Sequence, residues 1–269
     1  MRKRCVAMRL AVLGVLLLSS VLGACSTQPQ RPATGAFVKR ALTHDGATYR
    51  YQVFVPSQQA GGRHPPLILF LHGTGERGSD GAKPTQAGLG PYLRLHLVDF
   101  PAIVVFPQAP DASQWNGLAA TIAFDAMEQA SEEFGGDHDR TYLTGLSMGG
   151  YGVWELALMR PQRFAALVPI CGALLAPSDE RDLFVTPVAG ETDPYAALAR
   201  RLKDVPIWMF HGARDDLVLP HDDRLTYAAL RAAGGDVRYT EFPDANHNAW
   251  DPAYATPELW QWLLDQHRR

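Results

Sequence analysis

TYLTGLSMGGYG, the stretch from Thr141 to Gly152, places a single serine, Ser147, between glycines where one pattern changes into another. It begins within the β-prone run RTYLTG and continues into GGYGVWELALMR, which is apolar with helical spacing. Glycines two positions before and after the serine remove side chains that would collide with the strand or the helix at a sharp turn. The pattern Gly145-x-Ser147-x-Gly149 therefore predicts a strained strand-to-helix turn that exposes the serine hydroxyl. The alternative is a glycine-rich connector that contains a serine by chance.

Strand-like and helix-like segments alternate along the rest of the chain. Two β-rich runs, FVKRALT and ATYRYQVFVP, flank the turn signal HDG and predict an N-terminal antiparallel hairpin. Further runs are apolar and of strand length, among them PPLILFLHG, FPAIVVFPQAP, RFAALVPICG and VPIWMFHG. Such continuous apolar strands are typical of a parallel sheet that is buried on both faces. The sequence therefore predicts an α/β fold over residues 37–269, with a mostly parallel central sheet and helices on both faces.

The composition of the 269 residues agrees with one globular domain of this kind. Hydrophobic residues make up 46% and charged residues 20%, and the formal net charge is -3. The sequence has no basic stripe, so we expect no nucleic-acid partner. It also lacks an H-E-x-x-H motif and clustered Cys and His spacing, so we expect no metal site.

A serine hydroxyl is a poor nucleophile unless a base accepts its proton, and a carboxylate must orient that base. In α/β-hydrolases the acid and then the histidine follow the serine along the chain. His247 meets this order, because it lies in the loop FPDANHNAWDP, which follows the last predicted strand, DVRYTEF. The acid is expected just after the preceding strand, where HGARDD contains Asp215 and Asp216. This segment resembles the HGxxD segment of thioesterase-like α/β-hydrolases, which selects Asp215. The family usually has a proline four residues beyond the acid, whereas Pro220 is five beyond Asp215, so Asp216 stays open.

The loop after an early strand is expected to complete the site. It has the sequence LFLHGTGERG and contains the HG-x-G pattern from His72 onward, with glycines that let backbone N–H groups turn toward the serine. We predict that the N–H groups of Thr74 and Met148 form an oxyanion hole, in which they stabilise negative charge on a substrate oxygen. A phosphate cradle is the rival interpretation, but the spacing G-x-x-x-x-G-K-[ST] is absent. His72 is expected to brace the loop.

Together, FLHGTGERG, GLSMGGYG, HGARDD and NHNAWDPAY resemble the α/β-hydrolase esterases of the predicted-peptidase and phospholipase/carboxylesterase-like group. These are relatives of polyhydroxybutyrate depolymerases and acyl-protein thioesterases, and the resemblance runs from about Phe37 to the end. It implies hydrolysis of carboxylic esters without a metal or organic cofactor, with Ser147 as nucleophile, His247 as general base and Asp215 as orienting acid. The ester itself stays open among plant-wall acetyl or feruloyl groups, polyesters, lipids and small xenobiotic esters.

Two other functions share these features. A serine peptidase or amidase would use the same three side chains, because the acyl-enzyme is the same ester. A non-catalytic lipoprotein could keep the hydrolase fold for binding, but it would be expected to lack one of these side chains or the oxyanion loop.

Two tryptophans near the motifs are candidates for the substrate pocket, with the hydrophobic core as the equal alternative. Trp115, in PDASQWNG, follows the carboxyl end of a predicted strand, the edge at which ligands bind in such sheets. Trp250 lies three residues beyond His247.

Residues 1–24 predict an export signal. The basic run MRKRCVAMRL precedes AVLGVLLLSSVLGA, which is apolar but shorter than the roughly 20 residues of a membrane span. The leader ends in LGAC, which resembles the lipobox of bacterial lipoproteins and implies cleavage before Cys25 and lipidation of that residue. Residues 25–36 are polar and rich in proline, as in a flexible tether. With Ser26 after the cysteine, the lipoprotein rule favours the outer membrane; the alternative is an ordinary secretion signal.

Overall fold

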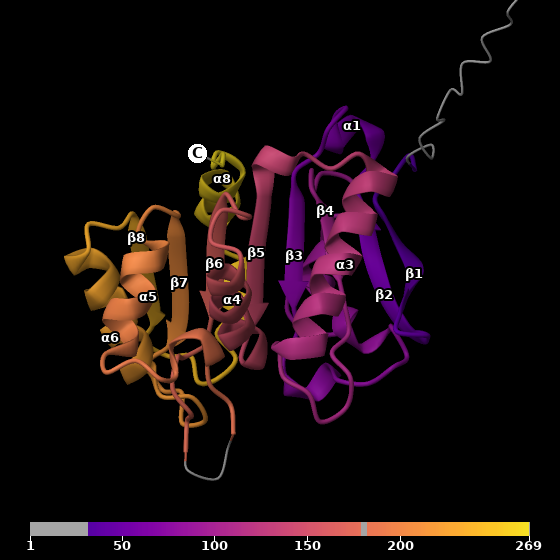
Figure 1. Cartoon of the computed structure of the whole chain (residues 1–269). Helices are drawn as coiled ribbons and strands as arrows, with labels where there is room; N and C mark the ends of the chain where they lie inside the picture. Colours follow the sequence, from indigo (N-terminus) through magenta and orange to yellow (C-terminus); the bar gives the residue numbers. More distant parts are fainter. Residues whose placement is uncertain (1–31, 179–181, 269) are drawn as a thin grey trace, which may run out of the picture.

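The computed structural model describes residues 32–178 and 182–268 and contains one eight-stranded sheet with helices on both faces (Figure 1). Its strands are β1 (Ala36–His44), β2 (Ala47–Val55), β3 (Leu67–Leu71), β4 (Ile103–Phe106), β5 (Thr141–Leu146), β6 (Ala166–Ile170), β7 (Ile207–Gly212) and β8 (Val237–Phe242). They lie in the order β1-β2-β4-β3-β5-β6-β7-β8. The pairs β1–β2 and β2–β4 are antiparallel and all other neighbours are parallel, so the predicted mostly parallel sheet is confirmed.

The predicted hairpin is formed by β1 and β2. Asp45 and Gly46 connect the two strands with φ angles of 49° and 79°. Positive φ at both central residues is the geometry of a type I′ turn, whose twist matches that of the strands it joins, and Asp-Gly is a favoured sequence for it.

Helices cover both faces of the sheet. The α-helices are α1 (Gln58–Gly61), α2 (Leu89–Leu95), α3 (Gly117–Phe134), α4 (Met148–Met159), α5 (Pro194–Leu202), α6 (Pro220–Ala232), α7 (Trp250–Tyr254) and α8 (Pro257–Leu264). Short 3-10 helices are η1 (Thr74–Glu76), η2 (Lys83–Thr85), η3 (His138–Arg140) and η4 (Thr186–Val188). The sequence patterns did not predict α1, α2 and α7.

Strand β3 illustrates how the core forms on both sides. Leu67, Leu69 and Leu71 belong to a hydrophobic cluster that includes side chains of α3, α4, α5 and α6. Ile68 and Phe70 belong to a second cluster, which includes side chains of α2, α7 and α8. Because successive side chains of a strand point to opposite faces, a continuous apolar run fills both clusters at once.

This topology brings the candidate site residues to one edge of the sheet. Strands β5, β7 and β8 are part of the parallel array, so the segments that follow them all emerge at its carboxyl edge. Strand β1 runs in the same direction as β4, because both are antiparallel to β2, and its first residue, Ala36, therefore lies at the opposite edge (Figure 1).

The predicted export signal, Cys25 and the first part of the tether lie outside the described residues. Within residues 32–178 and 182–268, no helix combines the length and the apolar character needed to cross a membrane.

Candidate active site

Ser147 lies in a sharp turn between β5 and α4. Its backbone has φ 55° and ψ -121°, a region that residues other than glycine seldom adopt. The Ser147 N–H donates to the carbonyl of Ile170 at 2.9 Å, which ties the turn to the end of β6. A Cβ atom at Gly145 would lie 2.4 Å from the carbonyl oxygen of Gly149, and one at Gly149 would lie 2.0 Å from that of Leu71. Close backbone packing therefore requires both glycines and holds the turn in its strained form.

A hydrogen-bonded series extends from the serine hydroxyl. Ser147 Oγ lies 2.9 Å from Nε2 of His247, and Nδ1 of His247 lies 2.6 Å from Oδ2 of Asp215. An ionised carboxylate only accepts hydrogen bonds, so Nδ1 of His247 carries the proton and Nε2 can accept the proton of the serine. This arrangement can transfer a proton from the hydroxyl to the imidazole as the oxygen attacks an electrophile.

Asp215, rather than Asp216, contacts the histidine. The Asp215 side chain is buried, and its Oδ1 accepts hydrogen bonds from the N–H groups of Leu217 at 2.9 Å and Val218 at 3.0 Å. Asp216 is exposed to solvent. Burial by itself would raise the pKa of Asp215, but the hydrogen bonds that it accepts from side chains and backbone outweigh burial and hold its pKa well below its usual range. Asp215 is therefore an ionised acceptor throughout the neutral range.

A second histidine, His211, lies behind Asp215 and was not singled out from the sequence. It is fully buried at the end of β7, with Nε2 2.9 Å from the carbonyl oxygen of Val218 and 3.2 Å from Oδ2 of Asp215. Its Nδ1 lies 2.7 Å from Oδ2 of Asp223, which is buried in the first turn of α6. Burial opposes the charged imidazolium, but hydrogen bonds with the two carboxylates prevail and raise the pKa of His211. The spacing of a strand-ending histidine four residues before the acid is the sequence signal for this contact.

We expect His211→Asn to lower the free energy of unfolding by about 3–5 kcal/mol, because it leaves Asp223 buried without its charged partner. Urea unfolding followed by circular dichroism measures the difference. His221→Asn is the matched control, since His221 is exposed in the same region. Equal stabilities of the two variants would contradict a charged His211–Asp223 pair.

Cys171 fixes the other side of the histidine loop. The buried thiol donates to the backbone carbonyl of His247 at 3.2 Å, and burial raises the pKa of the thiol above its usual range. In the described part of the chain, Cys171, His211 and Asp215 form a group whose potential metal-ligand atoms lie within 4.8 Å of one another. Each of these residues already makes hydrogen bonds that position the site. The group is therefore best explained as a hydrogen-bonded support for His247.

The two predicted oxyanion-hole donors each occupy the first position of a helix. Thr74 begins η1 and Met148 begins α4, so neither N–H has a partner within its own helix. Met148 follows Ser147 directly, and Thr74 lines the cavity in which Ser147 lies. Both N–H groups are available to a ligand at the serine, and their role as donors to an oxyanion stays a prediction.

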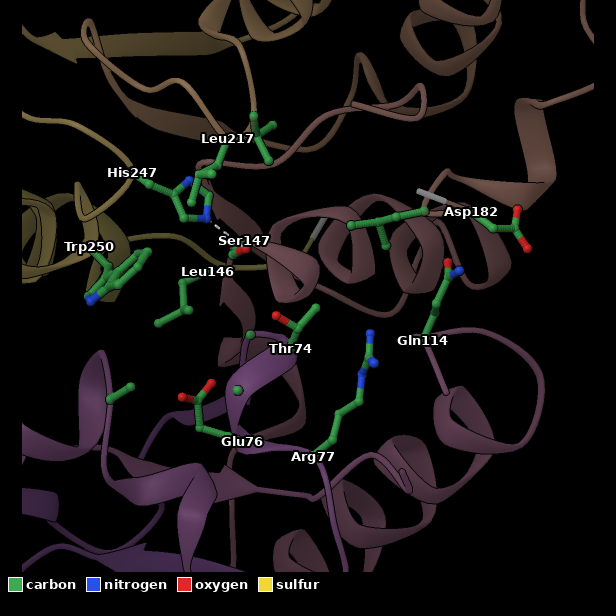
Figure 2. A pocket seen from close by; sticks show the side chains of 15 residues that line it. Thr74, Glu76, Arg77, Gln114, Leu146, Ser147, Asp182, Leu217, His247 and Trp250 are labelled. Atoms are coloured by element: carbon green, nitrogen blue, oxygen red, sulfur yellow. Dashed lines mark hydrogen bonds between the residues drawn. The ribbon is translucent and has the colours of Figure 1, made fainter. Parts of the chain in front are cut away.

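The serine faces a cavity of about 470 Å³ (Figure 2). Ser147, His247, Thr74 and Trp250 are among the residues that line it. The ring of Trp250 meets that of His247 edge-on, with centroids 5.5 Å apart. Of the two tryptophan candidates, Trp250 is thus the one placed at this cavity.

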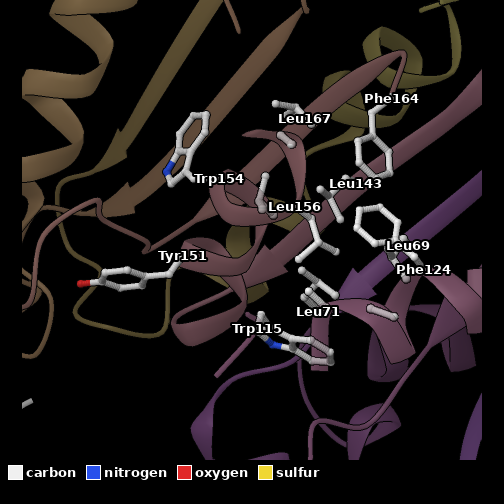
Figure 3. Close-up of a cluster of buried hydrophobic side chains, with 14 of the residues drawn as sticks. Leu69, Leu71, Trp115, Phe124, Leu143, Tyr151, Trp154, Leu156, Phe164 and Leu167 are labelled. Carbon is white, nitrogen blue, oxygen red and sulfur yellow. The ribbon is translucent and has the colours of Figure 1, made fainter. Parts of the chain in front are cut away.

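Trp115 requires a correction, because it lies in the hydrophobic core rather than in the cavity that contains Ser147 (Figure 3). It is only 2% exposed, and its Nε1–H donates to the carbonyl of His72 at 2.9 Å. His72 is itself buried, and its Nε2 accepts a hydrogen bond from Ala109 N–H at 3.0 Å. Burial lowers the pKa of His72 to about 4, so its imidazole is neutral and braces the loop. The indole of Trp115 thus supports the loop that begins at His72 and contains Thr74.

Comparisons with known proteins agree with this architecture. The chain is 29% identical to a structure described as a thermostable esterase, with a TM-score of 0.69, over 86% of this chain and 63% of that one. It is 19% identical to the substrate-bound fluorophosphonate-binding serine hydrolase F of Staphylococcus aureus, with a TM-score of 0.66, over 86% and 99% of the two chains. The second likeness shows the fold alone.

A sequence relative is an "Uncharacterized secreted protein" of Arthroderma benhamiae, 25% identical in an alignment of 205 residues that covers 68% of this chain. This chain spans only 21% of that protein and less than two thirds of the thermostable esterase. The predicted resemblance to esterase-like α/β-hydrolases is confirmed at the level of fold and family. The model of the prolyl oligopeptidase family matches residues 122–266, more than half of the chain. The chain therefore belongs to the prolyl oligopeptidase family and has the fold of a serine hydrolase.

Proposed function

We propose that the protein hydrolyses carboxylic esters through an acyl-enzyme on Ser147, with His247 as general base and acid and Asp215 as the orienting carboxylate. The observation that carries this proposal is the hydrogen-bonded series from Ser147 through His247 to Asp215, which opens on a cavity of about 470 Å³. The likeness to a thermostable esterase at 29% identity supports the choice of an ester.

In the proposed reaction, Ser147 Oγ attacks the ester carbonyl carbon while its proton passes to Nε2 of His247. The π electrons of the carbonyl move to its oxygen, where the N–H groups of Thr74 and Met148 stabilise the negative charge by roughly 3 kcal/mol per donor. The carbonyl then re-forms, the bond to the alcohol oxygen breaks, and that oxygen takes the proton from His247. Water attacks the acyl-enzyme with His247 again as base, and the carboxylic acid leaves with Ser147 restored.

A peptidase or amidase is the second candidate, and the family match is the observation that favours it. The first step is the same for an amide, but the leaving nitrogen must be protonated before its bond breaks. Esters and amides of the same acyl group therefore distinguish the two functions directly.

The test is a substrate panel on the purified protein, with p-nitrophenyl esters of increasing acyl length, acetylated and feruloylated plant-wall esters, and the matching p-nitroanilides. We expect the esters to be cleaved and labelling by a fluorophosphonate probe to be confined to Ser147. Faster cleavage of the anilides would favour the amidase, and the absence of both turnover and labelling would contradict a serine hydrolase.

We also propose that Cys25 anchors the protein to a bacterial outer membrane through lipid. A diacylglyceryl group with an amide-linked chain provides more than the single acyl chain that binds membranes only marginally. Strand β1 begins at the edge of the sheet opposite Ser147, and the proposed anchor precedes it by way of a tether that is expected to be flexible (Figure 1).

Cys25→Ala is expected to release or mislocalise the protein while the purified catalytic domain keeps its activity, because Cys25 precedes the predicted catalytic domain of residues 37–269. Fractionation and mass spectrometry of the mature amino terminus measure this. An unmodified terminus that begins at another residue would leave an ordinary secreted enzyme.

A further inference from the structure

The cavity has two chemically different ends, with Ser147 between them (Figure 2). The side chains of Leu146 and Trp250 form an apolar end beside His247. Arg77 and Gln114 lie at the other end and offer hydrogen-bond donors. An ester that fills the cavity must therefore present different chemistry on its two sides.

Arg77 holds an unused positive charge at the donor end. Its Nε and Nη2 lie 3.3 Å and 3.2 Å from Sδ of Met148, the buried side chain that follows the nucleophile. A thioether is a weak acceptor. Within the part of the chain that the structure describes, no carboxylate forms an ion pair with Arg77. Its guanidinium can therefore still bind a carboxylate with two parallel hydrogen bonds.

The carboxylates nearby do not neutralise this charge. Burial of Glu76 raises its pKa. The hydrogen bonds that its carboxylate accepts from backbone N–H groups of its own turn act in the opposite direction but are the smaller effect. Asp182 lines the cavity from its rim, where it is exposed to solvent, and Figure 2 shows its carboxylate directed away from Arg77. The remaining N–H donors and the positive charge of Arg77 are thus available to a ligand in the cavity.

We infer that Arg77, assisted by Gln114, binds a carboxylate on the acyl part of the substrate, so that the preferred substrates are half-esters of dicarboxylic acids. This inference rests on the proposed esterase function. The position of His247 decides which part of the ester lies at which end of the cavity. His247 must protonate the leaving oxygen, so the alcohol part departs beside His247 and Trp250. The acyl chain stays on Ser147 and extends toward Arg77 at the opposite end (Figure 2).

The test compares p-nitrophenyl hydrogen glutarate with p-nitrophenyl pentanoate, which share the leaving group and the length of the acyl chain. We expect kcat/KM for the glutarate to exceed that for the pentanoate by about ten- to a hundredfold, the usual effect of a hydrogen bond between charged groups. Arg77→Met should abolish this preference for the glutarate, and Arg77→Lys should keep part of it. Arg200→Met removes the same charge from a surface side chain that is 66% exposed, and it should retain the wild-type ratio.

A ratio that is the same in the wild type and in Arg77→Met would overturn the inference. So would a preference for a carboxylate on the alcohol part, measured with 4-acetoxybenzoate against 4-acetoxybenzamide. Because the ratio is taken within one enzyme preparation, it is independent of any general loss of activity in a variant. Failure of the proposed function looks different, since neither ester would then be hydrolysed and the fluorophosphonate probe would not label Ser147.

Discussion

Ser147→Ala is expected to lower the turnover of an ester by on the order of a million-fold while the protein stays folded. The hydroxyl oxygen is the atom that attacks the carbonyl carbon, and neither His247 nor Asp215 can replace it. Alanine at this position has the same strained φ of 55° as serine, so the substitution removes a hydrogen bond to His247 without adding backbone strain. Stopped assays with a chromogenic ester and circular dichroism of the same sample measure both effects.

Ser131→Ala is the matched control for that experiment. Ser131 is buried in α3, and its hydroxyl makes no hydrogen bond among the described residues, so its loss should change neither fold nor turnover. Substantial activity in a folded Ser147→Ala protein, with the control unchanged, would show that another group performs the attack.

Asp215→Asn is expected to lower activity by roughly ten-thousand-fold. The carboxylate of Asp215 accepts the Nδ1–H of His247 at 2.6 Å and thereby leaves Nε2 free to take the serine proton. A carboxamide can instead present an N–H to His247, which favours the tautomer whose Nε2 already carries a proton. The expected signature is a large loss in kcat, measured with the same ester as for Ser147→Ala.

Asp216→Asn is the neighbouring control, because the Asp216 side chain is exposed to solvent. We expect its kcat to stay within a few-fold of the wild type, since removal of a solvated surface charge typically has a small effect. A reversed order of the two effects would identify Asp216 as the acid and would contradict the loop geometry after β7.

Much of the fold could be predicted from the sequence because the deciding patterns are local. Asp45 and Gly46 specify a turn with two positive φ angles, and the continuous apolar run from Leu67 to Leu71 requires a strand buried on both faces. Helices α1, α2 and α7 escaped prediction because each is no longer than seven residues, too short for a helical period to stand out.

Some residues of the candidate site could likewise be recognised from local sequence patterns, and others could not. Ser147 was recognisable because its flanking glycines avoid steric conflicts within a few residues of it. His247 was recognisable because the base must follow the acid along the chain and lies in the loop after the last predicted strand. Which aspartate meets His247, and which tryptophan reaches the cavity, depends on the direction in which each loop leaves the sheet. Chain order says nothing about that direction.

The sequence by itself therefore determined the α/β fold and singled out Ser147 and His247 as the proposed nucleophile and base, since steric and periodic signals for them lie within short segments of the chain. Only the tertiary structure decided that Asp215 is the aspartate beside His247, that His211 and Asp223 lie behind Asp215, and that Trp115 belongs to the core. Only the tertiary structure also placed Arg77 at one end of the cavity. These contacts join residues that are distant along the chain, such as Asp215 and His247, which are 32 positions apart. They arise when parallel strands bring their carboxyl ends to a common edge, which no local pattern encodes.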